Sequence, residues 1–279
     1  MIFWPNSAMN SRINHKPMSL ASRETILNRD GLQLLQPDWP APANVHAWST
    51  SRIQGVSGAP YQGLNLALHV GDNADAVQHN RRHLAQVLAL PQSPLWLDQV
   101  HQQQVVNAAE WGNYGELNRP PEADAAYSPQ AGVVCVVMTA DCLPLLICNR
   151  RGDRVAAVHA GWRGLAAGVI ETTLAALQQP AAELLVWLGP AIGPSAFEVG
   201  EDVRQVFIAA DAGAASAFQQ NRPGHYLADI YALARRRLQA RGVQAIYGGG
   251  YCTFDDANHF YSYRRDGTTG RQASLIWFD

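Results

Sequence analysis

The chain has 279 residues, of which 47% are hydrophobic, and its formal net charge is −2 at pH 7. A core of that size folds without support from disulfides or a structural metal, so a metal bound here would serve chemistry. The charge balance argues against a nucleic-acid partner, because the densest basic patch, Arg235–Arg237, is typical of a solvated helix face. No stretch is long and apolar enough to span a membrane. Three of the four cysteines share one apolar stretch, so we expect reduced thiols and a cytoplasmic location.

The predicted elements begin well inside the chain. Residues 1–33 are predicted to be a disordered extension, because they are polar and aperiodic and lack the apolar segment of a signal peptide. Residues 34–279 are predicted to form one domain, which opens with a strand over Val45–Ser51. Apolar residues at helical spacing predict a helix over Asn73–Leu90.

The middle of the chain alternates buried strands with helices. Continuous apolar runs predict strands that are covered on both faces. A helix is predicted over Leu165–Gln179, two shorter helices follow, and the C-terminal part is predicted to form strands. This order favours an α/β fold, a layered sandwich with a mixed β-sheet in a single domain. The later strands are predicted over Gly132–Met138, Leu145–Cys148, Arg154–His159, Leu184–Leu188, Ala245–Tyr247, Phe260–Tyr263 and Ser274–Trp277.

One cysteine and two histidines at the ends of predicted elements are candidate metal ligands. Cys142 follows one buried strand, His159 ends the next, and His69 precedes a helix. Strand ends in α/β folds gather functional side chains, and zinc accepts Cys sulfur and His nitrogen. Three protein ligands leave a fourth position open for chemistry. Spacing alone also allows Cys142 and His159 to be buried core residues or a Cys/His nucleophile pair.

Other polar residues near these positions have more than one interpretation. His101, beside Gln99, is either a metal ligand or a substrate contact. Asp141, next to Cys142, is either a base or a residue that orients a ligand, and Asp72 near His69 has the same two interpretations. Among the arginines, Arg52 and Arg163 are candidates for phosphate or carboxylate recognition, although surface ion pairing is the ordinary role of either.

Eight stretches carry a resemblance to a known family. The chain resembles the bacterial YfiH-type proteins, a family formerly named multicopper polyphenol oxidases or laccase-like proteins and now usually described as purine nucleoside phosphorylases. The match runs in order from about residue 36 to the C-terminus. The stretches are Ser51–Ser57, Asn65–Asp72, Trp96–His101, Met138–Pro144, Ala157–Gly164, Trp187–Pro194, Phe197–Gly200 and Ser262–Asp266.

The resemblance implies a single α/β sandwich domain and a zinc site. It implies that the histidine of His-Val-Gly-Asp, the cysteine of Ala-Asp-Cys-Leu-Pro and the histidine of His-Ala-Gly-Trp-Arg hold the zinc, here His69, Cys142 and His159. The fold is similar to the catalytic domain of cytotoxic necrotizing factor, which uses a Cys/His pair. Gln54 and Gln102 stand where the family usually has glycine, which leaves substrate preference open.

The resemblance further implies a small-molecule enzyme that acts with phosphate. The expected substrates are inosine, guanosine, adenosine and methylthioadenosine, with adenosine deamination as a side activity. Catalysis is assigned to the three predicted ligands and Asp141, and substrate binding to Arg52, Gln99, His101 and Arg163. The alternatives are a copper-dependent polyphenol oxidase and an amide hydrolase that edits cell-wall peptide precursors. A monomer or small homo-oligomer is expected, without nucleic acid or membrane as a partner.

Overall fold

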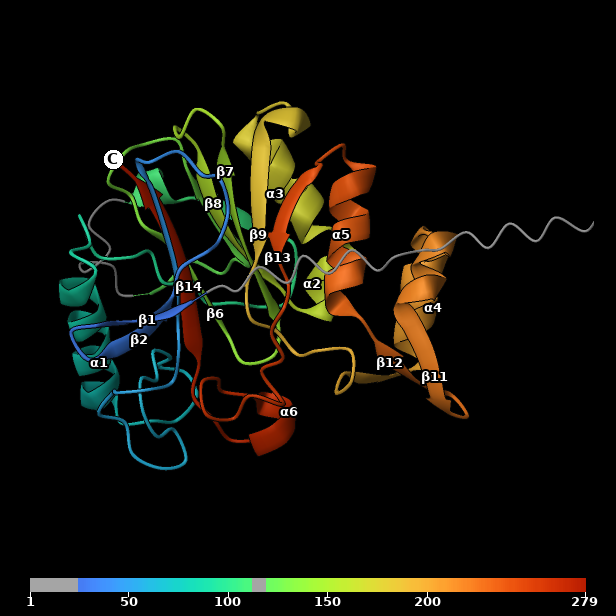
Figure 1. Ribbon diagram of the computed structural model, residues 1–279, viewed down its shortest axis with the longest axis horizontal. Coiled ribbons are helices and arrows are strands. Elements are labelled where there is room, and N and C mark those ends of the chain that lie inside the picture. Colours follow the sequence, from blue (N-terminus) through green and yellow to red (C-terminus); the bar gives the residue numbers. More distant parts are fainter. Residues whose placement is uncertain (1–24, 112–118) are drawn as a thin grey trace, which may run out of the picture.

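Two β-sheets lie face to face in this protein, with helices on both outer sides (Figure 1). The structure is a computed structural model that describes residues 25–111 and 119–279. Helix α1 (Ala74–Val87) covers one outer side, and helices α2 (Trp162–Ala167), α3 (Val169–Leu177) and α5 (Ile230–Ala240) cover the other. The predicted α/β sandwich in a single domain is therefore confirmed. No helix in the described ranges is long and apolar enough to cross a membrane.

The first sheet has five strands in the order β1-β2-β3-β14-β6, and every neighbouring pair is antiparallel. The second has six strands in the order β13-β9-β7-β8-β5-β4, and it is mixed because β13 pairs with β9 and β4 with β5 in parallel. The strands are β1 (Ile26–Arg29), β2 (Leu32–Leu35), β3 (Val45–Thr50), β4 (Val105–Asn107), β5 (Ala125–Ser128), β6 (Cys135–Thr139), β7 (Leu143–Asn149), β8 (Val155–Ala160), β9 (Leu184–Leu188), β13 (Ala245–Gly248) and β14 (Gln272–Phe278).

The continuous apolar runs are explained by burial on both faces. In β6, Cys135 and Val137 pack between the sheets, whereas Val136 and Met138 pack toward α1. This alternation follows from the two-residue repeat of a strand. The same division holds in β7, where Leu146 faces the inter-sheet core and its neighbours face α3 and α5. The turn that joins β6 to β7 therefore passes from one sheet to the other at one edge of the sandwich.

The remaining elements lie outside the two main sheets. A three-stranded sheet and helix α4 lie beside α5, at the right of Figure 1. The short helix α6 precedes β14. These elements are β10 (Glu198–Gly200), α4 (Glu201–Ala210), β11 (Phe218–Arg222), β12 (His225–Ala228), α6 (Tyr263–Asp266) and the 3-10 helices η1 (Ala108–Trp111), η3 (Ala181–Glu183) and η4 (Ala212–Ala217).

Three predictions differ from the structure in the existence, continuity or type of an element. Part of the predicted N-terminal extension is ordered, because β1 and β2 form a hairpin on the five-stranded sheet, while residues 1–24 lie outside the described residues. The predicted helix Leu165–Gln179 is two helices, since Gly168 adopts a left-handed conformation with φ +101 that ends α2. The predicted strand Phe260–Tyr263 instead leads into α6, whose first turn is capped by the Ser262 side chain.

Candidate active site

A cavity of about 360 Å³ opens at the edge where β6 passes into β7 and β8 ends. It gathers chemically competent side chains from five separate stretches of the chain. Its walls come from the loop before α1, the loop before β4, the end of β6 with the turn that follows, the end of β8, and the segment from α6 to β14. The lining residues are His69, Gln99, His101, Met138, Thr139, Ala140, Cys142, His159, Tyr263 and Arg271.

Cys142 lies in the turn that joins the two sheets. The preceding residue, Asp141, has φ +98, a conformation that L-residues rarely adopt and that costs of order 1–3 kcal/mol. The Asp141 carboxylate compensates by accepting hydrogen bonds from Thr253 Oγ1 at 2.7 Å and from the Arg264 backbone N–H at 2.6 Å. Both carboxylate oxygens are therefore engaged in holding the turn that presents Cys142.

His159 is fixed by a carboxylate that is completely buried. Asp124, at the start of β5, is 0% exposed, and its Oδ1 lies 2.8 Å from His159 Nδ1. The backbone carbonyl of Asp124 also accepts the His159 backbone N–H at 2.7 Å. With Nδ1 occupied in this way, the other ring nitrogen of His159, Nε2, is the one left for a metal or a reacting group.

Asp124 also sets the position of His101. Its carboxylate accepts the backbone N–H of His101 at 2.9 Å and that of Gln102 at 2.7 Å. His101 itself has φ +60, and its Nε2 lies 3.9 Å from Cys142 Sγ. Its ring meets that of His159 edge-on, with 4.8 Å between the ring centroids. One buried carboxylate thus organises two imidazoles around one thiol.

The side chains of Cys142, His159 and Asp124 shift one another's pKa values toward the charged forms. Burial alone would raise the pKa of the Cys142 thiol, but the charge of His159 and hydrogen bonds with His101 and His159 hold that pKa below its ordinary value. Burial alone would lower the pKa of His159, but Cys142 and Asp124 raise it. Asp124 also keeps a lowered pKa despite burial, because it accepts hydrogen bonds from His159, Gln102 and His101. Without a metal, the cavity therefore favours a thiolate beside an imidazolium.

The donor set fits a metal ion. The ligand atoms of His101, Cys142 and His159 all lie within 4.8 Å of one another. Two imidazole nitrogens and one thiolate are a zinc-type ligand set, and copper accepts the same donors. A histidine whose second nitrogen bonds a carboxylate is the usual arrangement around such a metal. The three side chains in this cavity can therefore hold a metal ion and leave further coordination positions to a substrate.

The predicted trio and the observed group differ in one member. Cys142 and His159 belong to both, but the structure brings His101 to them in the place predicted for His69. His69 lines the same cavity, and burial followed by the charge of Arg271 lowers its pKa. Both histidines lie in loops, and spacing along the sequence does not distinguish them. His69 therefore lines the cavity wall outside the group of three.

The other four predicted residues lie in four different places. Gln99 lines the cavity, but its amide exchanges two hydrogen bonds with the Met138 backbone at 2.7 and 2.8 Å, so it joins the His101 loop to β6. Arg52 lines a separate cavity and stacks on Tyr261. Arg163 lies over the neighbouring Trp162 ring and is absent from the cavity wall. Asp72 accepts hydrogen bonds from the Asn65 side chain and from the backbone N–H of Asn73, the residue before α1.

Four residues of this site were not predicted from the sequence. Asp124 stands in the small apolar run Ala123–Ala126, and an ionisable residue in a buried strand is a signal that points to function. Thr139 and Tyr263 belong to stretches whose neighbours carry the more obvious chemistry. Arg271 follows a glycine-rich turn, and nothing in its local pattern sets it apart from a surface arginine.

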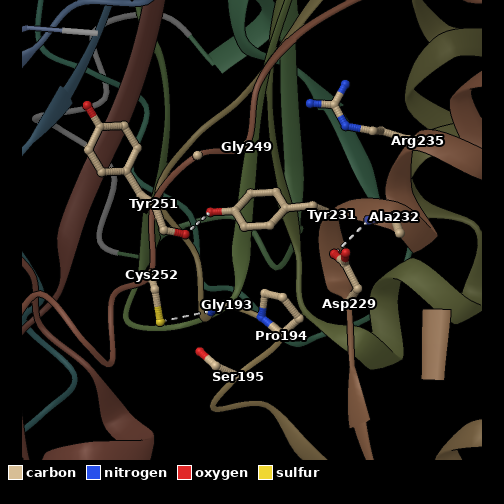
Figure 2. A pocket seen from close by; sticks show the side chains of 11 residues that line it. Gly193, Pro194, Ser195, Asp229, Tyr231, Ala232, Arg235, Gly249, Tyr251 and Cys252 are labelled. Carbon is tan, nitrogen blue, oxygen red and sulfur yellow. Dashed lines mark hydrogen bonds between the residues drawn. The ribbon is translucent and has the colours of Figure 1, made fainter. Parts of the chain in front are cut away.

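A second cavity, of about 350 Å³, lies between α5 and the loops after β9 and β13 (Figure 2). Its polar groups already have partners inside the protein. The Cys252 thiol accepts the Gly193 N–H at 3.2 Å, and burial raises its pKa. Tyr231 donates to the Tyr251 carbonyl, and Asp229 caps α5. The candidate chemistry therefore belongs to the cavity that contains Cys142.

Gly161 offers a direct test of how tightly the group is packed. A Cβ at this position would lie 3.0 Å from both Cys142 Sγ and His101 Cδ2. Gly161→Ala is therefore expected to displace these atoms. The kcat/KM of whichever reaction the cavity catalyses should fall by about tenfold or more, since small displacements at a reacting centre slow the reaction. Gly250→Ala is the matched control, because a Cβ there meets nothing within 4 Å. Equal kcat/KM for the two variants would contradict the packing described here.

The fold and this cavity define the class: an α/β sandwich protein with a candidate metal centre at the edge between its sheets. The family model described as multi-copper polyphenol oxidoreductase laccase matches residues 46–279. The chain therefore belongs to this family, and the predicted membership of the YfiH-type family is confirmed.

Relatives and solved structures agree with that assignment. The chain is 57% identical over 244 residues to a purine nucleoside phosphorylase of Pseudomonas aeruginosa, and the match covers 87% of this chain and 97% of the relative. It is 53% identical over 245 residues to purine nucleoside phosphorylase YfiH of Escherichia coli, covering 88% and 98%. A Neisseria meningitidis protein described as DUF152 has a similar structure, with a TM-score of 0.84 and 52% identity, covering 88% of this chain and 99% of the other.

Proposed function

We propose that this protein is a zinc-dependent purine nucleoside phosphorylase that acts on inosine, guanosine, adenosine and methylthioadenosine. The observation that carries the proposal is the group of His101, Cys142 and His159, organised by buried Asp124 in one cavity. The names of the two bacterial phosphorylases above support the choice of reaction. Free thiols at all four cysteines fit the reducing cytoplasm in which we place the protein.

The space around the group suits a nucleoside with phosphate. A neighbouring cavity of about 530 Å³ shares His69 and Met138 with the first. Its lining combines the apolar side chains of Leu68, Trp96 and Leu97 with polar ones that include Asp98 and Arg82. Apolar side chains with a few polar groups are typical of a site for a small molecule. We place the nucleoside across both cavities, with its ribose near Cys142.

The reaction balances without an external acid. An oxygen of monohydrogen phosphate forms a bond to ribose C1′ while the bond from C1′ to the purine nitrogen breaks. The electron pair leaves with the purine, which takes up the proton that the phosphate carried. A zinc ion bound at the three ligands would supply positive charge to oxygen atoms at the reacting centre. Asp124 holds the proton on His159 Nδ1 and keeps both imidazoles oriented during this step.

We also propose adenosine deaminase side activity in the same cavity. Water would add to C6 of adenosine and ammonia would leave, giving inosine, a reaction known for zinc sites that hold the purine ring. Asp141, whose carboxylate is bound by Thr253 and Arg264, is proposed to position Cys142 and not to act as the base.

The test is product analysis of zinc-loaded protein incubated with inosine, guanosine or adenosine and phosphate. Chromatography is expected to show the free purine with ribose 1-phosphate in equal amounts, and some inosine from adenosine. Free purine with unphosphorylated ribose would replace phosphorolysis by hydrolysis. Unchanged nucleoside after long incubation would refute purine nucleoside chemistry for this protein.

One observation favours a second candidate. Cys142, His159 and Asp124 are connected as thiol, imidazole and carboxylate, an order that also serves nucleophilic hydrolysis of amides. Chelator treatment separates the two functions, because a thiol-based amide hydrolase would keep its activity without metal. The copper-dependent oxidation of phenols is less well supported, since the described residues offer one three-ligand group and a multicopper centre needs more.

A further inference from the structure

Arg271 brings a positive charge to the cavity wall. Its NH1 group donates to the backbone carbonyls of Thr269 at 2.9 Å and Gly270 at 3.0 Å. In the ranges that the structure describes, no carboxylate forms an ion pair with it. Two other partly buried arginines differ in this respect: Arg237 pairs with Glu171 at 2.7 Å and Arg265 with Asp266 at 2.8 Å. A desolvated charge without a partner is costly, so the position of Arg271 suits an anionic ligand.

The backbone of Arg271 is fixed by two hydrogen bonds. Its backbone N–H donates to Asn65 Oδ1 at 2.9 Å, and its carbonyl accepts the Leu66 N–H. Burial lowers the pKa of Arg271, and the negative charges of Cys142 and Asp141 oppose that change. An arginine remains charged in such surroundings, so the guanidinium brings a fixed positive charge to the cavity that contains Cys142.

Thr139 adds an independent observation on the same wall. It is the last residue of β6, it is 2% exposed, and its register partner on β14 is Gln272, next to Arg271. Its hydroxyl Oγ1 is one of two buried side-chain polar atoms without a hydrogen-bond partner among the described residues; the other is Glu171 Oε2. A buried hydroxyl without a partner is unfavourable, and a ligand oxygen in the cavity would relieve it.

We propose that Arg271 and Thr139 form an oxyanion subsite that binds inorganic phosphate beside His101, Cys142 and His159. The guanidinium fork suits two phosphate oxygens, and the threonine hydroxyl donates to a third. This inference rests on the proposed function, to which it adds the residues that bind the second substrate. It also moves phosphate recognition away from Arg52, which lines a different cavity.

The test measures binding of inorganic phosphate to zinc-loaded protein by calorimetry, without nucleoside. Arg271→Gln is expected to raise the Kd for phosphate at least about tenfold, because charge-assisted hydrogen bonds are lost. Thr139→Val should weaken phosphate binding and leave Tm equal or higher, since it removes an unsatisfied group. Thr139→Ser should restore binding. Arg204→Gln, which alters a partly buried ion pair on α4, is the matched control. Zinc content is measured in every variant.

The possible results distinguish a failure of the proposed phosphate subsite from a failure of the proposed function. Wild-type protein that binds phosphate through Arg271 but forms no ribose 1-phosphate would refute the proposed function and keep the subsite. Phosphorolysis with an unchanged KM for phosphate in Arg271→Gln would overturn the subsite and keep the function. Adenosine 5′-monophosphate that binds in an Arg271-dependent way, while inorganic phosphate does not, would show recognition of a nucleotide and would also overturn the proposal. A fall in Tm for Thr139→Val would indicate a merely structural role.

Discussion

Cys142→Ala is expected to abolish metal binding and to lower the rate of phosphorolysis by about a thousandfold or more, because a metal contributes several kcal/mol to charge stabilisation and each 1.4 kcal/mol is a factor of ten. Cys142 is the one thiol among the three proposed ligands, and His101 and His159 lie beside it. His101→Ala is expected to behave in the same way. The measurement combines zinc content by mass spectrometry with release of ribose 1-phosphate from inosine.

His69→Ala decides between the observed group and the trio predicted from the sequence. His69 lines the cavity without joining the three ligand atoms. We therefore expect His69→Ala to retain zinc and to change mainly the KM for the nucleoside. Loss of zinc in His69→Ala together with full zinc in His101→Ala would contradict the site and support the sequence-based assignment.

Asp124→Asn is expected to lower both the affinity for zinc and kcat/KM. The carboxylate accepts hydrogen bonds from the Gln102 N–H, the His101 N–H and His159 Nδ1. The asparagine amide places an N–H₂ group where one of the two carboxylate oxygens lies in the wild-type protein. At least one of these donors therefore loses its acceptor. Replacing groups that orient metal ligands typically lowers metal affinity or activity by about 10- to 100-fold. Zinc affinity is measured with a competing chelator, and kcat/KM with inosine.

Stability gives a second readout for the same change. A buried donor without an acceptor costs about 1–3 kcal/mol, so Tm of Asp124→Asn should fall even without metal. Glu122→Gln is the matched control, two residues away, because Glu122 is exposed and pairs with Arg119 across a surface turn. Zinc affinity and Tm that are the same in Asp124→Asn and Glu122→Gln would show that Asp124 does not organise the ligands.

The sheets could be predicted from the sequence because their strands are buried on both faces. Runs such as Cys135–Thr139 and Leu184–Leu188 are apolar almost throughout, and an apolar run of that length between turn residues favours a strand. The hairpin of β1 and β2 could not be predicted in this way. Its strands are four residues long, and β1 is half-exposed, so its pattern resembles that of a polar terminus.

The candidate site was predictable where a strand end fixes a side chain. Cys142 directly precedes β7 and His159 lies near the end of β8, so their proximity follows from the pairing of β7 with β8. His101 lies in a loop whose path depends on hydrogen bonds to Asp124, a residue more than twenty positions later. The spacing of residues along the sequence does not predict that contact. The family resemblance indicated the type of site, and the three-dimensional structure identified His101 as the third member of the candidate group.

Titration of metal-free protein with zinc, while ribose 1-phosphate is released from inosine and phosphate, tests the central claim most directly. We predict that the rate rises in proportion to added zinc and stops rising at one equivalent per chain, because His101, Cys142 and His159 form one site. His101→Ala should show no such rise at the same zinc concentrations. A rate that does not depend on zinc, or no ribose 1-phosphate at any zinc concentration, would contradict the claim that this group is the catalytic metal centre of a nucleoside phosphorylase.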